Sequence, residues 1–123
     1  MVTVILFTIG ILMGASGGIL MKVGADQVGP QAIGSFNQLV SYLFQLFTNV
    51  PSLAGIVLYF CSAVVWAYLL TKLSISFVQP ILALTYVITP ILAILLLHET
   101  VPAMRWVGIL VIIVGVFLVA RTA

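Results

Sequence analysis

The charged side chains of this sequence all lie near the ends of long apolar runs, and this placement restricts the fold more than any other feature. The six formal charges are Lys22, Asp26, Lys72, Glu99, Arg105 and Arg121. An α-helix needs about 20 apolar residues to cross the roughly 30 Å hydrocarbon core of a bilayer. Because 64% of the 123 residues are hydrophobic and 5% are charged, the chain is expected to be an all-α integral membrane protein rather than a soluble domain.

We expect one membrane domain, residues 1–123, which contains four apolar runs. They predict transmembrane helices at about residues 2–21, 53–71, 76–97 and 103–120. The first run is longer than the 7–15 or so residues of a signal-peptide core, so we expect it to remain in the mature protein. Residues 33–48, in the first loop, alternate apolar and polar side chains at helical spacing and predict an interfacial amphipathic helix.

The third span carries more polar and helix-breaking residues than the others. Pro80 and Pro90 each remove one helical hydrogen bond, which predicts a local bend or an opened backbone where neighbouring helices can satisfy the freed carbonyls. Polar or small side chains gather on one face of this span, opposite an aliphatic stripe, and a similar face occurs on the second span. The candidate substrate-path residues are Tyr59, Ser62, Trp66, Ser76, Gln79, Tyr86 and Thr89. The alternative is that these groups only bond across helices, at about 1 kcal/mol each.

Glycines recur at regular spacing in the first and fourth spans. They are Gly10, Gly14 and Gly18 at four-residue spacing, and Gly108 and Gly115 at heptad spacing. Small residues let another helix backbone approach closely, so both sets predict helix or dimer packing.

Catalytic chemistry has no support in the sequence. There are no paired carboxylates, no Cys/His set and no glycine-rich phosphate loop, so we expect no enzyme, no cofactor and no bound metal. The single cysteine, Cys61, lies inside an apolar run and is interpreted as a small buried hydrophobe. His98 and Glu99 are interpreted as an interfacial pair. No charge lies at a membrane midplane, where proton-coupled transporters usually hold one.

The basic residues do not determine an orientation in the membrane. If the spans alternate, Lys72 and Arg121 lie on the side of the N-terminus, and Lys22 and Arg105 lie on the other. The positive-inside rule is then tied. A tie is typical of a protein that inserts both ways and forms antiparallel homodimers. A heterodimer with a paralogue and a larger membrane complex are the alternative assemblies; membrane lipids, not nucleic acid, are the other expected partners.

Three segments resemble the drug/metabolite transporter superfamily, in particular its four-helix members, the small multidrug resistance proteins and EamA-type proteins. They are GGILMK at 17–22, KLSISFVQPILAL at 72–84 and HETVPAMRWVGILVIIVGVFLV at 98–119. The last resembles the family's glutamate, short loop and Gly-x6-Gly fourth helix, which is the dimer contact in the small multidrug proteins. The resemblance covers nearly the whole chain except residues 33–48, and it implies transport across the inner cell membrane.

One departure from the multidrug pattern bears on mechanism. Those exporters carry a membrane-embedded glutamate eight residues before the lysine of the first span, and here that position is Gly14. Non-acidic first spans resemble instead the subunits that flip undecaprenyl-phosphate-linked aminoarabinose and related lipid-linked sugars. This resemblance implies a dimeric transporter that flips or exports an amphipathic or lipid-linked (polyprenyl-phosphate sugar) substrate, with Lys22 meeting the phosphate.

Two alternatives stay open. The chain could be a non-transporting accessory subunit of a larger membrane complex, or a small multidrug-type exporter without the usual glutamate. A continuous polar crevice between the second and third spans favours transport. Faces plugged by Trp66 and Tyr86 favour the accessory role.

Overall fold

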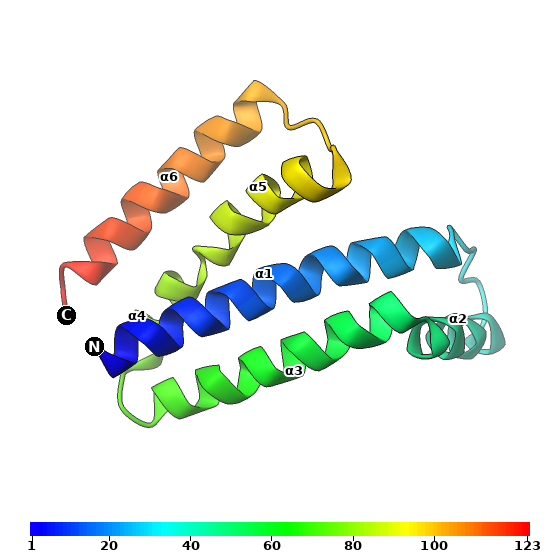
Figure 1. Cartoon of the computed structure of the whole chain (residues 1–123), viewed down its shortest axis with the longest axis horizontal. Coiled ribbons are helices and arrows are strands. Elements are labelled where there is room, and N and C mark those ends of the chain that lie inside the picture. Colours follow the sequence, from blue (N-terminus) through cyan, green and yellow to red (C-terminus); the bar gives the residue numbers. More distant parts are fainter.

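The computed structural model describes residues 1–123 and consists of α-helices joined by short connections (Figure 1). The helices are α1 (Val2–Val28), α2 (Phe36–Thr48), α3 (Val50–Leu70), α4 (Ile75–Leu82), α5 (Thr85–Leu97) and α6 (Ala103–Ala120). Four segments are long and apolar enough to cross a membrane, namely α1, α3, α4 with α5, and α6. The predicted all-α membrane protein with four spans is confirmed.

Helix α1 is the centre of the bundle. It packs along α3 on one side and against α5 on the other, while α6 lies beyond α5 (Figure 1). In the most apolar window of α1, 39% of the residues are buried, compared with 11% in each of the other three spans. The outer sides of α3, α5 and α6 are therefore apolar and exposed, and must meet lipid or another subunit.

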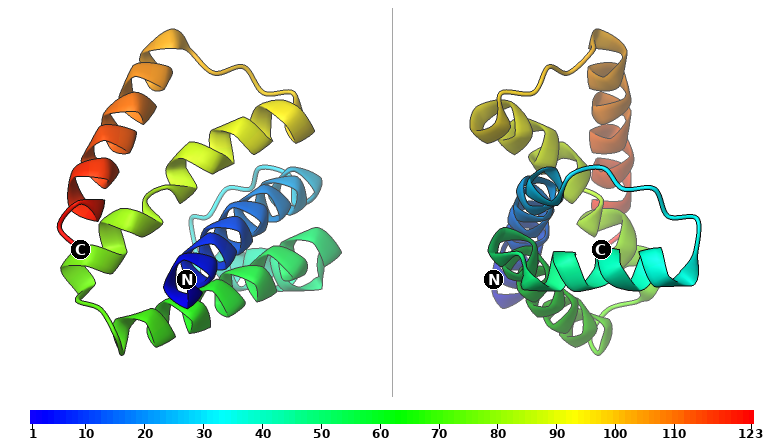
Figure 2. Two further views of the ribbon diagram at one scale, coloured as in Figure 1. Left: turned by 60° about the vertical axis from the view of Figure 1, so that its left-hand side comes forward. Right: turned by 90° about the vertical axis from the view of Figure 1, so that its right-hand side faces the viewer.

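Both chain termini lie at one end of the bundle (Figure 1). Helix α2 lies at the opposite end and crosses the direction of α1 and α3 (Figure 2, right). This is the orientation that a helix needs in order to lie along a membrane surface. The side-chain amide of Gln31, in the loop before α2, donates a hydrogen bond of 2.6 Å to Oε1 of Gln45 within the helix.

The closest helix contact joins α1 and α3 through glycines other than the three at regular spacing. A Cβ added to Gly17 would lie 3.0 Å from the Gly55 carbonyl oxygen, and a Cβ on Gly55 would lie 2.7 Å from the Gly17 oxygen. Nearer the α2 end, a Cβ on Gly24 would collide with the Ser52 hydroxyl. These three positions let the two backbones approach within direct contact, as small residues do in membrane helices.

The first span is longer than the sequence predicts. Helix α1 runs to Val28 instead of ending near residue 21, and Lys22 and Asp26, one turn apart, form an ion pair of 2.9 Å within the added turns. Gly29 then ends the helix at φ 84°, a conformation that glycine adopts at little cost, and Pro30 follows. The second span begins earlier than residue 53, at Val50, because the Asn49 side chain accepts a hydrogen bond from the Ser52 N–H.

The third span is interrupted between its two prolines. After α4, the N–H groups of Ala83 and Leu84 donate to carbonyls three residues back, at 3.1 Å, and those of Tyr86 and Val87 do the same at 2.9 and 3.0 Å. Such bonds form a tight 3₁₀-like turn rather than a continuous α-helix. The bend that the prolines predict is therefore present, and it separates α4 from α5.

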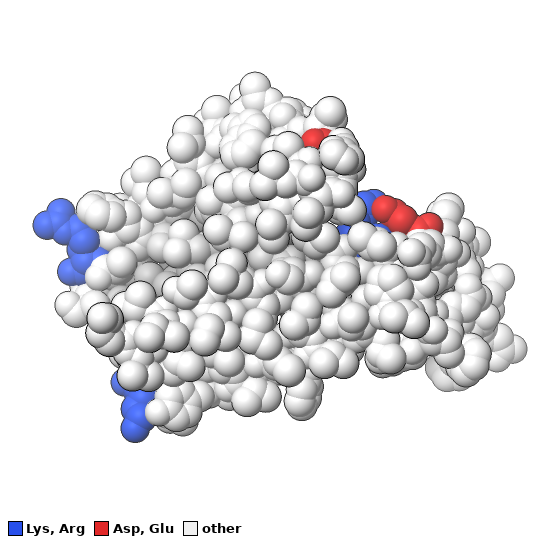
Figure 3. Space-filling model, in the orientation of Figure 1, with Lys and Arg blue, Asp and Glu red and all other residues white.

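The hydrophobic core lies toward the end that holds the termini. It is built from α1, α3, α4 and α6, and its buried members are Phe7, Leu69, Val78, Ile81 and Val116. The Phe7 and Phe77 rings meet edge to face, with centroids 6.3 Å apart. Charged groups stand only at the two ends of the bundle, and the acidic ones occur at the end away from the termini (Figure 3).

Candidate functional site

A cavity of about 250 Å³ lies where α1, α3 and the α4–α5 interruption meet, and we call it the cleft. Its lining residues are Gly10, Gly14, Tyr59, Ser62, Gln79, Leu82, Ala83, Thr85 and Tyr86. None of them carries a charge. The cleft therefore joins one polar face from each of two spans over a glycine-lined floor on α1.

The floor of the cleft is open because two glycines of α1 face it. A Cβ on Gly14 would lie 3.5 Å from the Ser62 hydroxyl oxygen and 3.7 Å from Cγ2 of Thr85. The Ser62 hydroxyl donates a hydrogen bond of 2.9 Å to the Gly10 carbonyl, which ties α3 to α1 at this level. A long side chain at Gly14 would extend into the cleft and fill it.

The polar side chains of the rim are free to bind a ligand. Tyr59, Gln79 and Tyr86 are exposed, and no side-chain hydrogen bond within the chain uses them, in contrast to Ser62. Together they offer two phenol hydroxyls and one amide, which can both donate and accept. The cleft can hydrogen-bond an uncharged, hydroxyl-rich group but has no carboxylate with which to hold a cation or a proton.

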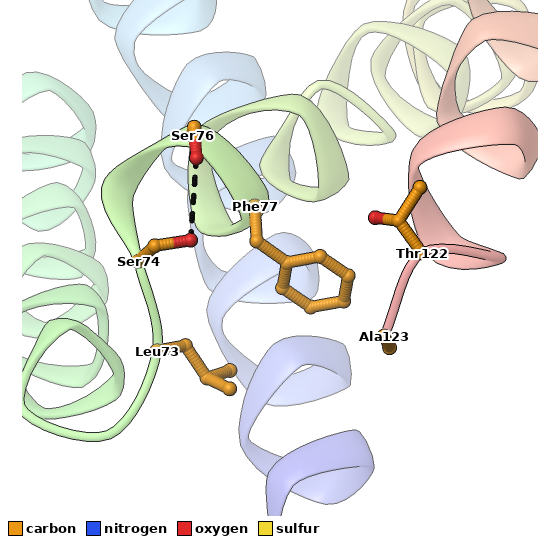
Figure 4. A pocket seen from close by; sticks show the side chains of 6 residues that line it. All are labelled: Leu73, Ser74, Ser76, Phe77, Thr122 and Ala123. Carbon is orange, nitrogen blue, oxygen red and sulfur yellow. Dashed lines mark hydrogen bonds between the residues drawn. The ribbon is translucent and has the colours of Figure 1, made fainter.

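Four of the seven predicted substrate-path residues line the cleft: Tyr59, Ser62, Gln79 and Tyr86. Trp66, Ser76 and Thr89 do not. Trp66 packs against the hydrophobic core, where its indole Nε1 is buried without a partner. Ser76 lies 3.2 Å from Ser74, oxygen to oxygen, in a different cavity near the chain ends (Figure 4). Thr89 is half-buried on α5, outside the cleft lining.

Thr85 is a cleft residue that a regular helix would not predict. In an α-helix each residue advances about 100°, which turns Thr85 away from Gln79 and Tyr86. In the tight turn at Ala83 and Leu84 each residue advances about 120°, and this rotates Thr85 toward the same side. In the sequence, Pro80 and Pro90 indicate that the helix is disturbed near Thr85. A proline does not by itself predict how far the backbone rotates.

The five glycines assigned to packing occupy three different settings. Gly10 and Gly14 line the cleft, and a Cβ on Gly18 would lie 3.0 Å from the Tyr59 hydroxyl. Gly108 and Gly115 have no atom within 4 Å of the position of an added Cβ. Within this chain the fourth-span glycines therefore pack against nothing.

Lys22 lies beyond the cleft on α1. Eight residues separate it from Gly14, a rise of about 12 Å in a helix. Its Nζ is 2.9 Å from Oδ1 of Asp26, and both side chains are more than half exposed, at 51% and 61%. No group of three or more His, Cys, Asp or Glu side chains is placed to hold a metal ion.

Comparison with known proteins agrees with this architecture. The EamA-like transporter family matches residues 1–121. A relative from Aeromonas hydrophila, a probable 4-amino-4-deoxy-L-arabinose-phosphoundecaprenol flippase subunit, is 27% identical over 99 residues, which cover 80% of this chain and 87% of the relative. No solved structure matches the chain. The family match extends over all four membrane-spanning segments and both walls of the cleft, and the chain therefore belongs to the EamA-like transporter family of membrane proteins.

Proposed function

We propose that the chain is one subunit of a dimeric flippase of the inner membrane, and that the cleft passes the sugar headgroup of a polyprenyl-phosphate-linked substrate. The observation that carries the proposal is the uncharged lining of the cleft, which includes Gly14. The resemblance to the small multidrug resistance proteins implies that those exporters carry a glutamate at this position. The substrate class is taken from the Aeromonas hydrophila relative, whose name specifies a lipid-linked aminosugar.

The chemistry of the cleft suits a sugar. The amide of Gln79 and the hydroxyls of Tyr59 and Tyr86 can exchange hydrogen bonds with sugar hydroxyls as the headgroup moves, so no polar group is left unpaired in the membrane. Trp66 packs against the core and does not line the cleft. Of the two residues that could plug the path, Tyr86 alone therefore stands at the cleft, and it is 66% exposed. This arrangement supports transport over a purely accessory role.

A second subunit completes the path in this proposal. The walls of the cleft come from only three spans, and α6 takes no part. The open surface at Gly108 and Gly115 allows close approach of a helix from another subunit. That subunit is a second copy of this chain or a paralogue.

Lys22 is the proposed contact for the substrate phosphate. It stands at the α2 end of α1, at the level where a phosphate in the lipid headgroup region would be found. Its ion pair with Asp26 is exposed and held by one hydrogen bond. A phosphate can replace that carboxylate as the partner at small cost, because exposed ion pairs contribute only about 0–1 kcal/mol.

Reconstitution into liposomes tests the proposal. Purified protein is incorporated alone and together with a co-expressed paralogue, and the accessibility of a headgroup-labelled polyprenyl-phosphate aminosugar is followed from outside. We expect flipping in at least one of the two preparations, with none in protein-free liposomes. If neither flips this lipid, and the chain instead increases the activity of a partner transporter, the accessory role is correct and the proposed function is wrong.

A further inference from the structure

A separate groove lies on the opposite side of the α4–α5 interruption from the cleft. It has a volume of about 450 Å³ and runs between the first half of α1, α4 and the end of α6, with Val4, Phe7 and Ile81 among its walls. A smaller cavity of about 220 Å³ shares Ile11 and Leu84 with it and continues it along α5. The walls are apolar, and the hydroxyl of Thr8, which faces both cavities, is already bonded to the Val4 carbonyl at 2.9 Å.

The groove has a polar mouth at the end of the bundle that holds the termini. A cavity of about 320 Å³ there shares Leu73 and Phe77 with the groove, so the two adjoin. Hydroxyls of Ser74 and Ser76 stand on one wall of this mouth and that of Thr122 on the other (Figure 4). The combined site changes from polar to apolar along its length.

Basic residues flank the mouth without acidic neighbours. Lys72 and Arg121 directly precede the mouth residues Leu73 and Thr122, and both are exposed. The Arg121 guanidinium lies 5.8 Å from the centre of the Phe117 ring, on the α6 side. Both acidic side chains of the protein, Asp26 and Glu99, belong to the other end of the bundle (Figure 3). The charged side chains at the end of the bundle that holds the mouth are therefore all basic.

The length of the groove matches one lipid chain. Its α1 wall extends from Thr3 in the larger cavity to Leu12 in the smaller one, which is about 14 Å along the helix. This is close to one leaflet, half of the roughly 30 Å hydrocarbon core. The extended acyl chain of a lipid in one leaflet spans the same depth.

We propose that the groove holds one acyl chain of an anionic bilayer phospholipid, with its phosphate at the mouth near Lys72 and Arg121. The lipid enters from the leaflet at the end of the chain termini. Ile81 and Leu84 face the groove, whereas Leu82, Ala83 and Thr85 face the cleft. The bound chain therefore supports the back of the interrupted helix whose front lines the cleft. The site does not depend on the proposed transport activity.

Quenching of tryptophan fluorescence by brominated lipids tests this site. In a Trp66→Phe/Trp106→Phe background, Phe77→Trp places a reporter between mouth and groove, and Val4→Trp gives a second reporter on the α1 wall if the first disturbs folding. Leu118→Trp, on the exposed side of α6 near Arg121, is the matched control. Each variant is reconstituted with chain-brominated phosphatidylglycerol or chain-brominated phosphatidylcholine at the same mole fraction.

We expect phosphatidylglycerol to quench the groove reporters more strongly than phosphatidylcholine does, and the Leu118→Trp control to show a smaller preference. Neutralising Lys72 and Arg121 to Gln should lower the preference by about fivefold per residue, whereas Lys22→Gln and Arg105→Gln at the other end should not change it. Equal quenching by both lipids would overturn the proposal, and so would a preference as large at Leu118→Trp. A lack of quenching by either lipid would mean that the groove is closed or filled by a second copy of the chain, and would also overturn it.

Discussion

The contact between Gly17 and Gly55 is the most sensitive point of the fold, and Gly55→Ala tests it. The added methyl group would lie 2.6 Å from Cγ of Met21, 2.7 Å from the Gly17 oxygen and 2.9 Å from the Met21 nitrogen. Two of these three neighbours are backbone atoms, which cannot rotate away. Because non-bonded heavy atoms normally stay about 3.5 Å apart, α3 must move off α1 by roughly 0.6 to 0.8 Å.

The expected cost follows from two opposing terms. Overpacking that forces backbone shifts costs about 1 to 3 kcal/mol, and replacing Gly by Ala inside a helix returns about 1 kcal/mol. Gly108→Ala supplies the matched control in the monomeric protein, since an added Cβ there meets no atom of its own chain within 4 Å; both variants are compared at a dilution in micelles that keeps the chain monomeric, because Gly108 is also a proposed subunit contact. The gain in helix propensity from Gly to Ala is the same in both variants. The free energy of unfolding of Gly55→Ala should therefore be lower than that of Gly108→Ala by about 1 to 3 kcal/mol.

Unfolding in mixed micelles, with increasing mole fraction of SDS and far-UV circular dichroism as readout, measures this difference. The free energy of unfolding should be about 1 kcal/mol above that of the wild type for Gly108→Ala and about 0 to 2 kcal/mol below it for Gly55→Ala. Equal stability of the two variants would mean that α1 and α3 do not pack at these glycines, and would refute the helix arrangement on which the cleft depends.

Three further predictions follow from the arrangement of the helices. Gly115→Leu should weaken subunit association, because its side chain holds off a facing helix; unchanged cross-linking would exclude α6 as the interface. Gly14→Glu should abolish headgroup flipping by filling the cleft of about 250 Å³, whereas the wild type should show no pH-driven efflux of quaternary ammonium dyes; dye efflux that a pH gradient drives would locate a coupling carboxylate elsewhere. Cysteines at Gln38 and Arg121 in a Cys61→Ala background should be labelled from opposite sides of the membrane within one molecule, and same-side labelling would show that α2 lies at the wrong end.

The membrane fold could be predicted from the sequence because its main signals are local. The length of each apolar run and the position of charges at its ends follow from the thickness and the polarity of a bilayer. Helix ends were less predictable, since they depend on contacts such as the Lys22–Asp26 pair and the Asn49 cap. Those contacts lie at the turns by which α1 ends later and α3 starts earlier than hydropathy indicates.

The cleft could be predicted only in part. Periodicity placed Gln79 and Tyr86 on one face, and both line the cleft. Seven residues at about 100° each come back to nearly the same direction, and the roughly 40° that the tight turn adds leaves Tyr86 within about 20° of it. Periodicity failed for Thr85, which the tight turn rotates inward, and for Trp66, which belongs to the core. Spacing also could not show which glycines make the closest contact, because Gly17 gains its role from Gly55, a residue 38 positions later on another helix.

The most direct test of the cleft as a headgroup path is the rate of flipping of the labelled polyprenyl-phosphate aminosugar by three variants. Gln79→Leu and Tyr86→Phe each remove hydrogen-bonding groups from the rim, while Thr89→Val removes a hydroxyl of α5 outside the cleft lining. A lost hydrogen bond of about 0.5 to 1.5 kcal/mol predicts rates roughly two- to tenfold lower for the two cleft variants. Thr89→Val should flip at the wild-type rate at equal amounts of folded protein. Unchanged rates for both cleft variants, or an equal loss with Thr89→Val, would contradict the account.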